Sequence, residues 1–488
     1  MRSQPNILVI HADQHRIDCL GPYGNPDVQT PHIDSLAADG VVYNEPFCTF
    51  PVCTPSRYSL LTGVSVRQHG GYTNQSSLPL ALPTFADILG NAGYRTKAVG
   101  KMHLNPTYLD VGFDELLVAE QNGLGRLDDD YHRWLRDEGL VDRIDLMSEV
   151  PEFRKDGPQE YYDNHSALES DLDDAHHSTT WIGDRALETL DSWDESAHVL
   201  MVGFIKPHHP YDPPASWSGM YAPEDLTLLP GWTTEASPGD LEYHSGTHPH
   251  RNLTEKLLRQ AMAYYYALVS QIDFHVGRMI DCLKRKGLYD DTLILYTSDH
   301  GDYQGFHHMV GKLNYMYDPL AKVPLIIKYP DQALAGETSD GLVSNIDVAP
   351  TILRAAGSDV PDTMKGFDLI QKGEGQRELV FAEAKAGEHL MVRSQTRKLL
   401  LCKDGSQSLF FDLVNDPMEL NNLYEDPGHR QEVEEYTQAG TEWFASQHPV
   451  TDDPGRGRPL VRGANVPALD DGHREDMLEY FRREMKGA

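Results

Sequence analysis

Short apolar runs that alternate with amphipathic helical segments are the feature that most limits how this sequence can fold. Each run has the length of a buried strand, and the longest helical segment, residues 255–287, carries a sustained apolar stripe. Such alternation predicts a largely parallel sheet with helices on both faces. The expected strands are NILVIHA (6–12), YRTKAVG (94–100), HVLMVGFI (198–205), TLILYTSD (292–299) and VPLIIKYP (323–330).

The pattern changes after about residue 376, where short apolar runs are separated by turn residues and predict antiparallel strands. We therefore expect an α/β fold with a large mixed, mostly parallel sheet sandwiched by helices over residues 1–375. A smaller α+β subdomain with an antiparallel sheet follows over residues 376–488. From about residue 450 the chain is rich in Pro, Gly and charge, which predicts either an arm across the protein or a partner subunit, or a frayed tail.

Composition excludes several kinds of partner. The 488 residues carry a formal net charge of −33, which disfavours nucleic acid and anionic membranes. No run of about 18 or more apolar residues predicts a transmembrane helix. Five irregularly spaced cysteines form neither a disulfide framework nor a zinc pattern and fit a reducing compartment. Because no leader pattern precedes the first apolar run, the sequence as given predicts a cytoplasmic location.

Polar residues that can carry chemistry follow four of the expected strands. In open α/β sheets ligands bind outside the carboxyl ends of the strands, so side chains at four such ends are expected to share one site. A single Asp after a strand means little, because Asp is common in turns. The residues concerned are Asp13, Gln14, Lys101, His103, Lys206, His208, His209, Asp299, His300 and Asp302.

Some of these residues are suited to a metal ion. Asp13, Gln14 and Asp299 offer oxygen ligands, and His300 stands beside them. Mostly oxygen donors suit a hard divalent cation, Ca²⁺ or Mg²⁺, more than zinc. The alternative is that the two aspartates only cap turns.

Other residues supply cationic and proton-donating groups. Lys101, His103, His208 and Lys312, placed beside a metal, form a pocket for a tetrahedral oxyanion. Lys312 follows the 292–299 strand by a short loop and is expected to fold back over the site. The alternative for Lys312 is a solvated surface lysine.

The segment FPVCTPSRYSLLTG (50–63) places a cysteine at the mouth of a predicted helix that begins near Pro55. A helix N-terminus favours an anion, and Arg57 lies one turn along the same face, so a thiolate at Cys53 would be activated. A buried structural cysteine is the usual alternative. A cysteine protease is disfavoured, because a metal site and lysines do not suit acyl transfer.

The segment CTPSR (53–57) resembles the C-x-P-x-R signature of the type I sulfatases, a family of the alkaline phosphatase superfamily. Further segments are similar to the family along nearly the whole chain. They are HADQHR (11–16), TPHIDSLAADG (30–40), LLTG (60–63), GKMH (100–103), KPHHPYDPP (206–214), SDHGDYQGFHHMVGK (298–312) and LFFDLVNDPMELNNL (409–423).

The resemblance implies a specific chemistry. A formylglycine-generating enzyme would convert Cys53 to Cα-formylglycine, whose hydrate is the nucleophile. Asp13, Gln14, Asp299, His300 and the modified Cys53 would hold the cation, usually calcium, with magnesium or manganese as alternatives. Arg57 and His103 would orient the hydrate, Lys101 and Lys312 would bind sulfate oxygens, and His208 would protonate the leaving alkoxide. Asn74 and His307 are expected to contact substrate.

Two positions depart from the family pattern. Gln14 replaces a second Asp, and Gln also occurs in phosphonate monoester hydrolases and phosphodiesterases, which are the alternative function. Lys101 and His103 are both present, which favours a sulfatase. Met102 replaces Trp, a change in packing. The expected substrate is a sulfated saccharide, or else an aryl or alkyl sulfate, and the C-terminal arm is a candidate for homo-oligomer contacts.

Overall fold

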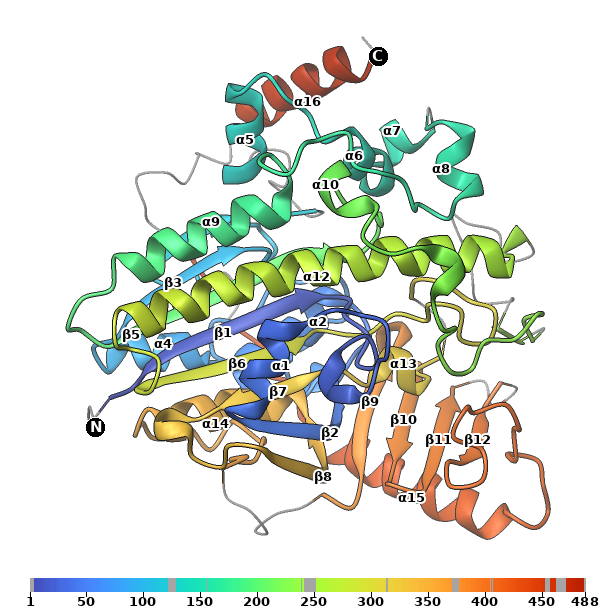
Figure 1. Cartoon of the computed structure of the whole chain (residues 1–488). Helices are drawn as coiled ribbons and strands as arrows, with labels where there is room; N and C mark the ends of the chain where they lie inside the picture. The colour runs from blue at the N-terminus through green and yellow to red at the C-terminus, as the bar shows by residue number, and fades with distance from the viewer. Residues whose placement is uncertain are drawn as a thin grey trace.

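The computed structural model contains two separate β-sheets, flanked by helices (Figure 1). It describes residues 4–121, 129–155, 157–237, 239–240, 252–312, 315–370, 377–403, 405, 407–452, 457–461 and 471–486. The main sheet has eight strands in the order β4 (Glu115–Val118), β3 (Arg95–Gly100), β5 (His198–Pro207), β1 (Asn6–Asp13), β6 (Thr292–Ser298), β7 (Leu325–Lys328), β2 (Val41–Phe47) and β8 (Glu337–Ser344).

Seven of the eight strands run in one direction. Strand β1 pairs parallel with β5 and β6, so that Ile7 lies opposite Val199 on one side and Leu293 on the other. Strand β7 is antiparallel to both of its neighbours. The prediction of a mixed, mostly parallel sheet is therefore confirmed. The carboxyl ends of β3, β5, β1 and β6 lie at the same edge.

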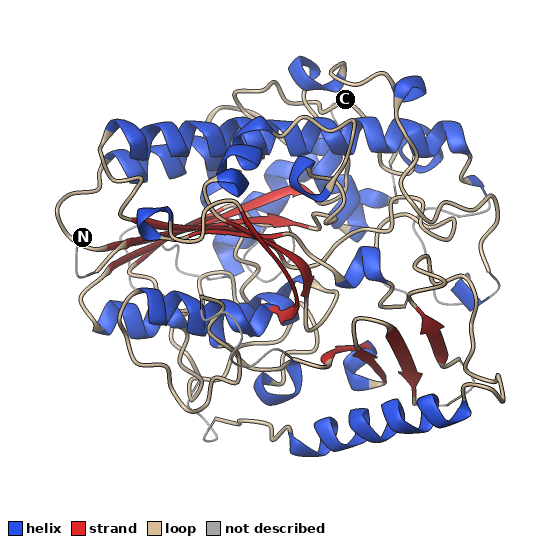
Figure 2. Cartoon of the chain, turned by 60° about the horizontal axis from the view of Figure 1, so that its bottom comes forward, coloured by secondary structure: helices blue, strands red, loops and turns tan. Residues whose placement is uncertain are grey.

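Helices cover both faces of this sheet, which Figure 2 shows between two helical layers. Along β1, Leu8 and Ile10 pack into the core beneath one layer, whereas Ile7 and Val9 pack into the core beneath the other. This alternation follows from the period of two along a strand. One layer contains α1 (Pro31–Ala38), α9 (Ser178–Asp191) and α12 (Glu255–Arg285), and the other contains α2 (Cys53–Thr62), α4 (Phe85–Asn91) and α14 (Val348–Ala355).

Shorter helices lie over the edges and in the loops between these elements. They are α3 (Val66–His69), α5 (Asp130–Asp137), α6 (Arg143–Glu149), α7 (Pro151–Arg154), α8 (Gln159–Asp163), α10 (Ala215–Ser218) and α13 (Asp318–Ala321). Single turns of 3₁₀ helix occupy Gly21–Tyr23, Pro223–Asp225, Pro330–Gln332, Asn345–Asp347 and Lys385–Gly387.

The C-terminal part forms the second sheet. Its strands are antiparallel throughout, as predicted, and α15 (Arg430–Ser446) packs against them. Phe381 of the sheet stacks on Trp443 of this helix, with ring centroids 4.8 Å apart. The strand order is β12 (Leu409–Asp412), β11 (Arg397–Cys402), β10 (His389–Arg393) and β9 (Val380–Ala384).

The end of the chain returns to the opposite side of the protein, where α16 (Asp471–Lys486) lies beside α5 (Figure 1). Met477 and Phe481 of this helix are buried against Val141, Leu146 and Phe153. The expected C-terminal arm thus packs on its own chain, and homo-oligomer contacts through it stay a prediction.

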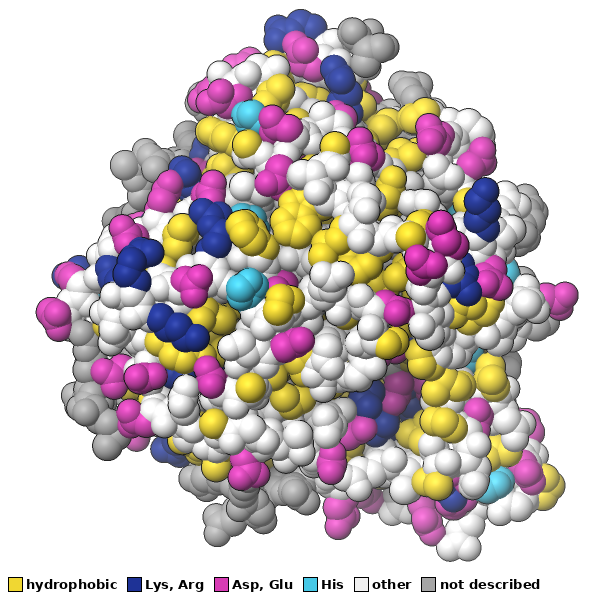
Figure 3. All heavy atoms as spheres, viewed as in Figure 1, with side chains coloured by type: hydrophobic (Ala, Val, Ile, Leu, Met, Phe, Trp, Pro, Cys, Tyr) yellow, Lys and Arg dark blue, Asp and Glu magenta, His cyan; other side chains and the backbone are white. Residues whose placement is uncertain are grey.

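The surface in Figure 3 carries acidic side chains scattered among basic ones. A recess opens on this face between the main sheet and the C-terminal sheet, and charged side chains of both signs meet there. Among the helices described, none is long and apolar enough to cross a bilayer.

Candidate active site

Four adjacent strands end at one edge of the main sheet and bring the predicted polar residues together. Asp13 is the last residue of β1, and Asp299 directly follows β6. Lys101 directly follows β3, and His208 directly follows β5. All four side chains are buried. The neighbouring positions of these strands place two acids, a lysine and a histidine around one point.

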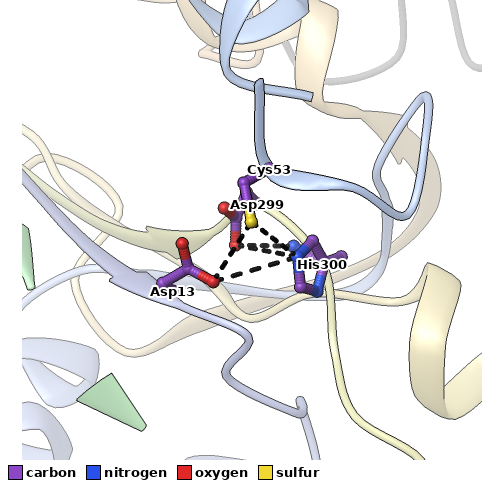
Figure 4. A group of neighbouring side chains, drawn as sticks. All are labelled: Asp13, Cys53, Asp299 and His300. Atoms are coloured by element: carbon purple, nitrogen blue, oxygen red, sulfur yellow. Dashed lines mark hydrogen bonds and ion pairs between the residues drawn. The ribbon is translucent and has the colours of Figure 1, made fainter. Parts of the chain in front are cut away.

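Helix α2 directs its N-terminus at this edge, and Cys53 is its first residue, ahead of the expected start near Pro55. The Cys53 Sγ atom lies 3.4 Å from His300 Nε2 and 3.6 Å from Asp13 Oδ1 (Figure 4). Every residue of this helix is buried. The free N–H groups at the start of the helix therefore add a positive partial charge where the nucleophile is expected.

A candidate cation site lies beside the cysteine. Ligand atoms of Asp13, Cys53, Asp299 and His300 all lie within 4.8 Å of one another (Figure 4). Within the described part of the chain, the buried Oε1 atom of Gln14 has no hydrogen-bond donor, while its Nε2 donates to Asp302. A buried carbonyl without a donor is satisfied by a cation. The donor set of carboxylates, an amide oxygen and an imidazole fits a divalent metal ion.

Arg57 reaches across the site and joins the two acids. Its Nη2 donates to Asp13 and its Nε donates to Asp299, both over 3.0 Å. Burial alone would raise the pKa of Asp13, but the cations Lys101 and Arg57 outweigh it and hold that pKa well below its usual range. Burial is also outweighed at Asp299, where His300 and Arg57 lower the pKa to about 2, so both acids are ionised near neutral pH. Arg57, which was expected to orient the modified cysteine, acts in this structure on the carboxylates.

Lys312 lies over Cys53, as expected from its position after the 292–299 strand. Its Nζ lies 3.2 Å from Cys53 Sγ and 2.9 Å from His208 Nε2. Burial lowers the pKa of Lys312, but Cys53, Asp13 and Asp299 outweigh burial and raise it. The ammonium group therefore keeps its charge and faces the position of a bound anion.

The hydrogen bonds of His208 determine which ring nitrogen carries the proton. Its Nδ1 lies 2.5 Å from the carbonyl oxygen of His209, which can only accept, so Nδ1 is protonated. Nε2 then accepts from Lys312. Burial, followed by Lys312, lowers the pKa of His208 well below its usual value. In the free protein His208 is neutral.

His103 and Asn74 both lie at the start of helix α2. The Thr54 hydroxyl donates to the carbonyl of His103 over 2.8 Å, and the Thr54 N–H donates to Asn74 Oδ1 over 3.2 Å. His103 is buried and has a left-handed backbone with φ 53°. Both residues thus border the residue that follows Cys53.

His307, in contrast, lies at the contact with the C-terminal subdomain. Its Nε2 lies 2.8 Å from the carbonyl oxygen of Met418, and its Nδ1 lies 3.4 Å from Asp240. Its ring stacks on that of Phe306. Among the described contacts none joins His307 to Cys53, so the structure does not bring it into the charged cluster.

Sequence analysis missed two residues that follow β4. Glu120 Oε1 accepts from the backbone N–H of Met102 over 3.1 Å and of His103 over 2.9 Å. Gln121 Oε1 accepts from Lys101 Nζ over 2.8 Å. The available signal was the apolar segment ELLV at 115–118, which is only four residues long.

Comparison with known proteins assigns the chain to a family. A sequence model described as Sulfatase matches residues 5–358, which is most of the chain, including Cys53. The chain belongs to the sulfatase family. A second model, described as N-sulphoglucosamine sulphohydrolase, C-terminal, matches residues 305–442 of this sulfatase. The prediction of a type I sulfatase, an enzyme of the alkaline phosphatase superfamily that hydrolyses sulfate esters, is confirmed.

Relatives of this sulfatase match over most of its length. An arylsulfatase of Clostridium perfringens is 31% identical, with 88% of this chain and 92% of the relative covered. An N-acetylglucosamine-6-O-sulfatase of Bacteroides thetaiotaomicron is 26% identical, with 86% and 83% covered. The crystal structure of a phosphonate monoester hydrolase of Agrobacterium radiobacter superposes with a TM-score of 0.76 at 24% identity, covering 91% of this chain and 96% of the other.

Proposed function

We propose that this sulfatase cleaves sulfate monoesters with residue 53 as its nucleophile, after Cys53 has been converted to Cα-formylglycine by a formylglycine-generating enzyme. The position of Cys53 Sγ carries the proposal, because it lies between the Asp13 carboxylate and the Lys312 ammonium. The Sγ atom of Cys53 in this structure marks the position that a hydroxyl of the hydrated aldehyde takes in the modified enzyme. A site built from carboxylate ligands for a hard cation and from the Lys312 ammonium stabilises an oxygen nucleophile better than a thiolate.

The reaction has two steps. A hydroxyl oxygen of residue 53 attacks sulfur and gives its proton to solvent by way of the Asp13 carboxylate, the ester S–O bond breaks, and the alcohol leaves with a proton from His208. The second hydroxyl then passes its proton to His208, the C–O bond to sulfate breaks, and the aldehyde is restored, which one water hydrates again. Lys101 and Lys312 neutralise the sulfate oxygens throughout. Peptide mass at residue 53 and turnover of 4-nitrophenyl sulfate test the proposal, and turnover by material that holds only the thiol would contradict it.

Substrate binding is expected to prepare His208 as the acid. In the free protein the Nε2 atom of His208 accepts from Lys312 and cannot donate. When a sulfate ester takes over the Lys312 hydrogen bond, its negative charge also raises the pKa of His208. The acid is then formed where the leaving oxygen lies, because Nδ1 stays bonded to the carbonyl of His209.

Asp13, Gln14, Asp299 and His300 are the residues that hold the divalent cation in this proposal, together with modified residue 53. Calcium is the first choice, and magnesium or manganese are alternatives. Such a cation lowers the pKa of the attacking hydroxyl. The unpartnered Oε1 of Gln14 supports the assignment. Elemental analysis of the purified enzyme, with loss of activity on chelation and recovery with one added metal, identifies the ion.

A sulfated saccharide is the proposed substrate, because one relative is an N-acetylglucosamine-6-O-sulfatase. Simple aryl or alkyl sulfates are the second choice, and an arylsulfatase is also among the relatives. A panel of sulfated monosaccharides compared with 4-nitrophenyl sulfate separates the two. If no sugar is cleaved faster than the aryl ester, the saccharide assignment is wrong.

Phosphonate monoester hydrolysis is the alternative activity, favoured by Gln14 at a position where many sulfatases have Asp. The fold shared with a phosphonate monoester hydrolase is compatible with it. Lys101, buried against Asp13 at 2.7 Å, favours the sulfatase reaction. Rates on 4-nitrophenyl sulfate and on 4-nitrophenyl phenylphosphonate decide between the two.

A further inference from the structure

We propose that Gln121 is a positioning residue that couples the sulfate-binding Lys101 to the acid His208. The inference rests on the proposed function, since it assigns a partner to two residues of that reaction. Gln121 is fully buried at the carboxyl end of β4, the strand that flanks β3. From there its side-chain amide bonds to Lys101, which follows β3, and to the backbone carbonyl of His209, which follows β5.

The amide of Gln121 uses both its ends. Its Oε1 accepts from Lys101 Nζ over 2.8 Å. Its Nε2 donates to Asp145 Oδ1 over 2.7 Å and to the carbonyl oxygen of His209 over 3.3 Å. A lysine ammonium only donates and a carbonyl only accepts, so the orientation of the amide is unambiguous. Each of its hydrogen-bonding groups has a partner.

The oxygen end of the amide determines where the Lys101 ammonium points. Lys101 Nζ has two acceptors in the described chain, Asp13 Oδ2 at 2.7 Å and Gln121 Oε1. An ammonium has three N–H groups, so one remains for an oxygen of the bound ester. Without Gln121 the ammonium is free to rotate about Asp13, and the direction of the third N–H is lost.

The nitrogen end acts on His208 through the backbone. The carbonyl oxygen of His209 accepts from both Gln121 Nε2 and His208 Nδ1. This carbonyl keeps the Nδ1 proton of His208 in place and leaves Nε2 toward Lys312 and the leaving group. Asp145 on α6 fixes the amide from the other side. Gln121 therefore holds the tautomer that the acid step needs.

The test compares Gln121→Leu with Gln271→Leu, a matched control. Gln271 is also fully buried and donates to an aspartate, Asp174, over 2.9 Å, but it lies on α12, and its side-chain hydrogen bonds in the described chain go to Asp174 and Thr180 alone, neither of which has a role in the proposed reaction. Rates are measured on 4-nitrophenyl, phenyl and 4-methoxyphenyl sulfate, whose leaving groups become progressively poorer. Peptide mass gives the formylglycine content, and thermal unfolding gives the folded fraction.

For Gln121→Leu we expect kcat/KM to fall about 10-fold on 4-nitrophenyl sulfate and about 100-fold on 4-methoxyphenyl sulfate, in the range of supporting residues that orient a reacting group. The loss should grow along the series, because weaker protonation penalises poor leaving groups most. The inhibition constant of inorganic sulfate should also rise, because Lys101 is misdirected. Gln271→Leu should change neither the slope along the series nor sulfate inhibition.

Gln121→Glu separates the two ends. One carboxylate oxygen still accepts from Lys101, so the third N–H keeps its direction, and the sulfate inhibition constant rises only through the added negative charge, by the same factor at low and high ester reactivity. The other oxygen faces the Asp145 carboxylate and the His209 carbonyl, both acceptors, so the steep loss on poor leaving groups should remain. This pattern cannot arise from a general loss of folding.

Several outcomes overturn the inference. Equal losses on all three esters in Gln121→Leu, or losses matched by Gln271→Leu, mean that Gln121 only supports the fold. A Gln121→Glu enzyme with an unchanged leaving-group series removes the His208 half of the proposal. If the unaltered enzyme bears formylglycine and cleaves none of the sulfate esters, the proposed function fails instead.

Discussion

Two clusters of buried and half-buried charged side chains differ in whether their charges cancel, and we relate that difference to a structural role for one cluster and a functional role for the other. The first joins β2 and α13 to strands β10 and β11 of the C-terminal sheet. Three carboxylates there meet three cations within ion-pair distance. The members are Glu45, Asp318, Glu419, Lys322, Arg393 and Lys398.

The second cluster is the candidate active site, and the charges of its described residues do not cancel. Asp13 and Asp299 face three cations, Arg57, Lys101 and Lys312. A buried excess of positive charge is costly unless an anion compensates it. The balanced cluster is complete within the protein, whereas the proposed function completes the unbalanced one with an anionic substrate. The comparison predicts that changes in the first affect stability and changes in the second affect turnover.

The largest expected effect is that of Cys53→Ala. Turnover of 4-nitrophenyl sulfate should disappear, because no other side chain at the site replaces the nucleophile. The thermal unfolding midpoint should change little, because Cys53 is not a member of the balanced cluster of ion pairs. The measurement is product release at high enzyme concentration, with peptide mass confirming the substitution. Retention of the original rate would show that residue 53 is not the nucleophile.

Next in size is His208→Ala, which tests the acid within the unbalanced cluster. General acid catalysis contributes about 10²–10⁴-fold, and the loss should be greatest on 4-methoxyphenyl sulfate. On 4-nitrophenyl sulfate the loss should be much smaller, because nitrophenolate leaves without a proton. Steady-state rates along the same ester series measure the difference. Equal losses on both esters would remove His208 from the acid role.

The sequence was sufficient to predict the two-sheet architecture, five of the eight strands of the main sheet and most of the residues that converge at the strand ends. Long apolar runs such as residues 6–12 and 292–299 identify buried strands, and their ends locate Asp13 and Asp299. Strands β2, β4 and β8 were not among the expected strands, and β4 is a run of only four residues, too short to distinguish from a loop. With β4 missing, Gln121 at its end could not be placed beside Lys101.

Contacts across the fold were the other limit of prediction. Helical spacing relates Arg57 to Cys53, but it does not indicate that the guanidinium spans two strands. His307 follows the Asp299 segment in sequence, yet the chain turns there with φ 50° at His307 and directs its ring toward Met418. Sequence proximity to a site therefore did not predict spatial proximity.

The third prediction concerns the balanced cluster. Burial alone would raise the pKa of Asp318, but Arg393 and Lys398 outweigh it and lower that pKa. Lys398→Met removes this cation from the buried Glu419 and the half-buried Asp318, which should lower the free energy of unfolding by about 3–5 kcal/mol. Chemical denaturation measures the loss, and kcat per folded molecule should be unchanged.

A matched control for that change is Lys403→Met. Lys403 also pairs with a carboxylate, Glu388, at 3.3 Å, but its side chain is 75% exposed. Its loss should cost no more than about 1 kcal/mol. If Lys398→Met is no more destabilising than this control, the balanced cluster does not hold the two sheets together.

The smallest expected effect is a pH dependence at Glu120, which lies beside the unbalanced cluster. Burial raises the pKa of Glu120 from an ordinary value of 4.5 to about 8. Between these values the folded state holds a proton that the unfolded chain has released. Unfolding free energy must therefore fall as pH rises through this window, by up to about 1.4 kcal/mol per unit.

Glu120→Gln removes this titration while keeping an oxygen acceptor for the N–H groups of Met102 and His103. The difference in unfolding free energy between variant and parent, measured by denaturation from pH 5 to pH 8, should shift in favour of the variant as pH rises. Ionised Glu120 would also offset the excess positive charge near Lys101, so KM for 4-nitrophenyl sulfate should rise above pH 8 in the parent alone. If the difference in unfolding free energy does not change with pH, Glu120 is already ionised at pH 5. Its negative charge would then reduce the excess of three cations over two carboxylates in the second cluster.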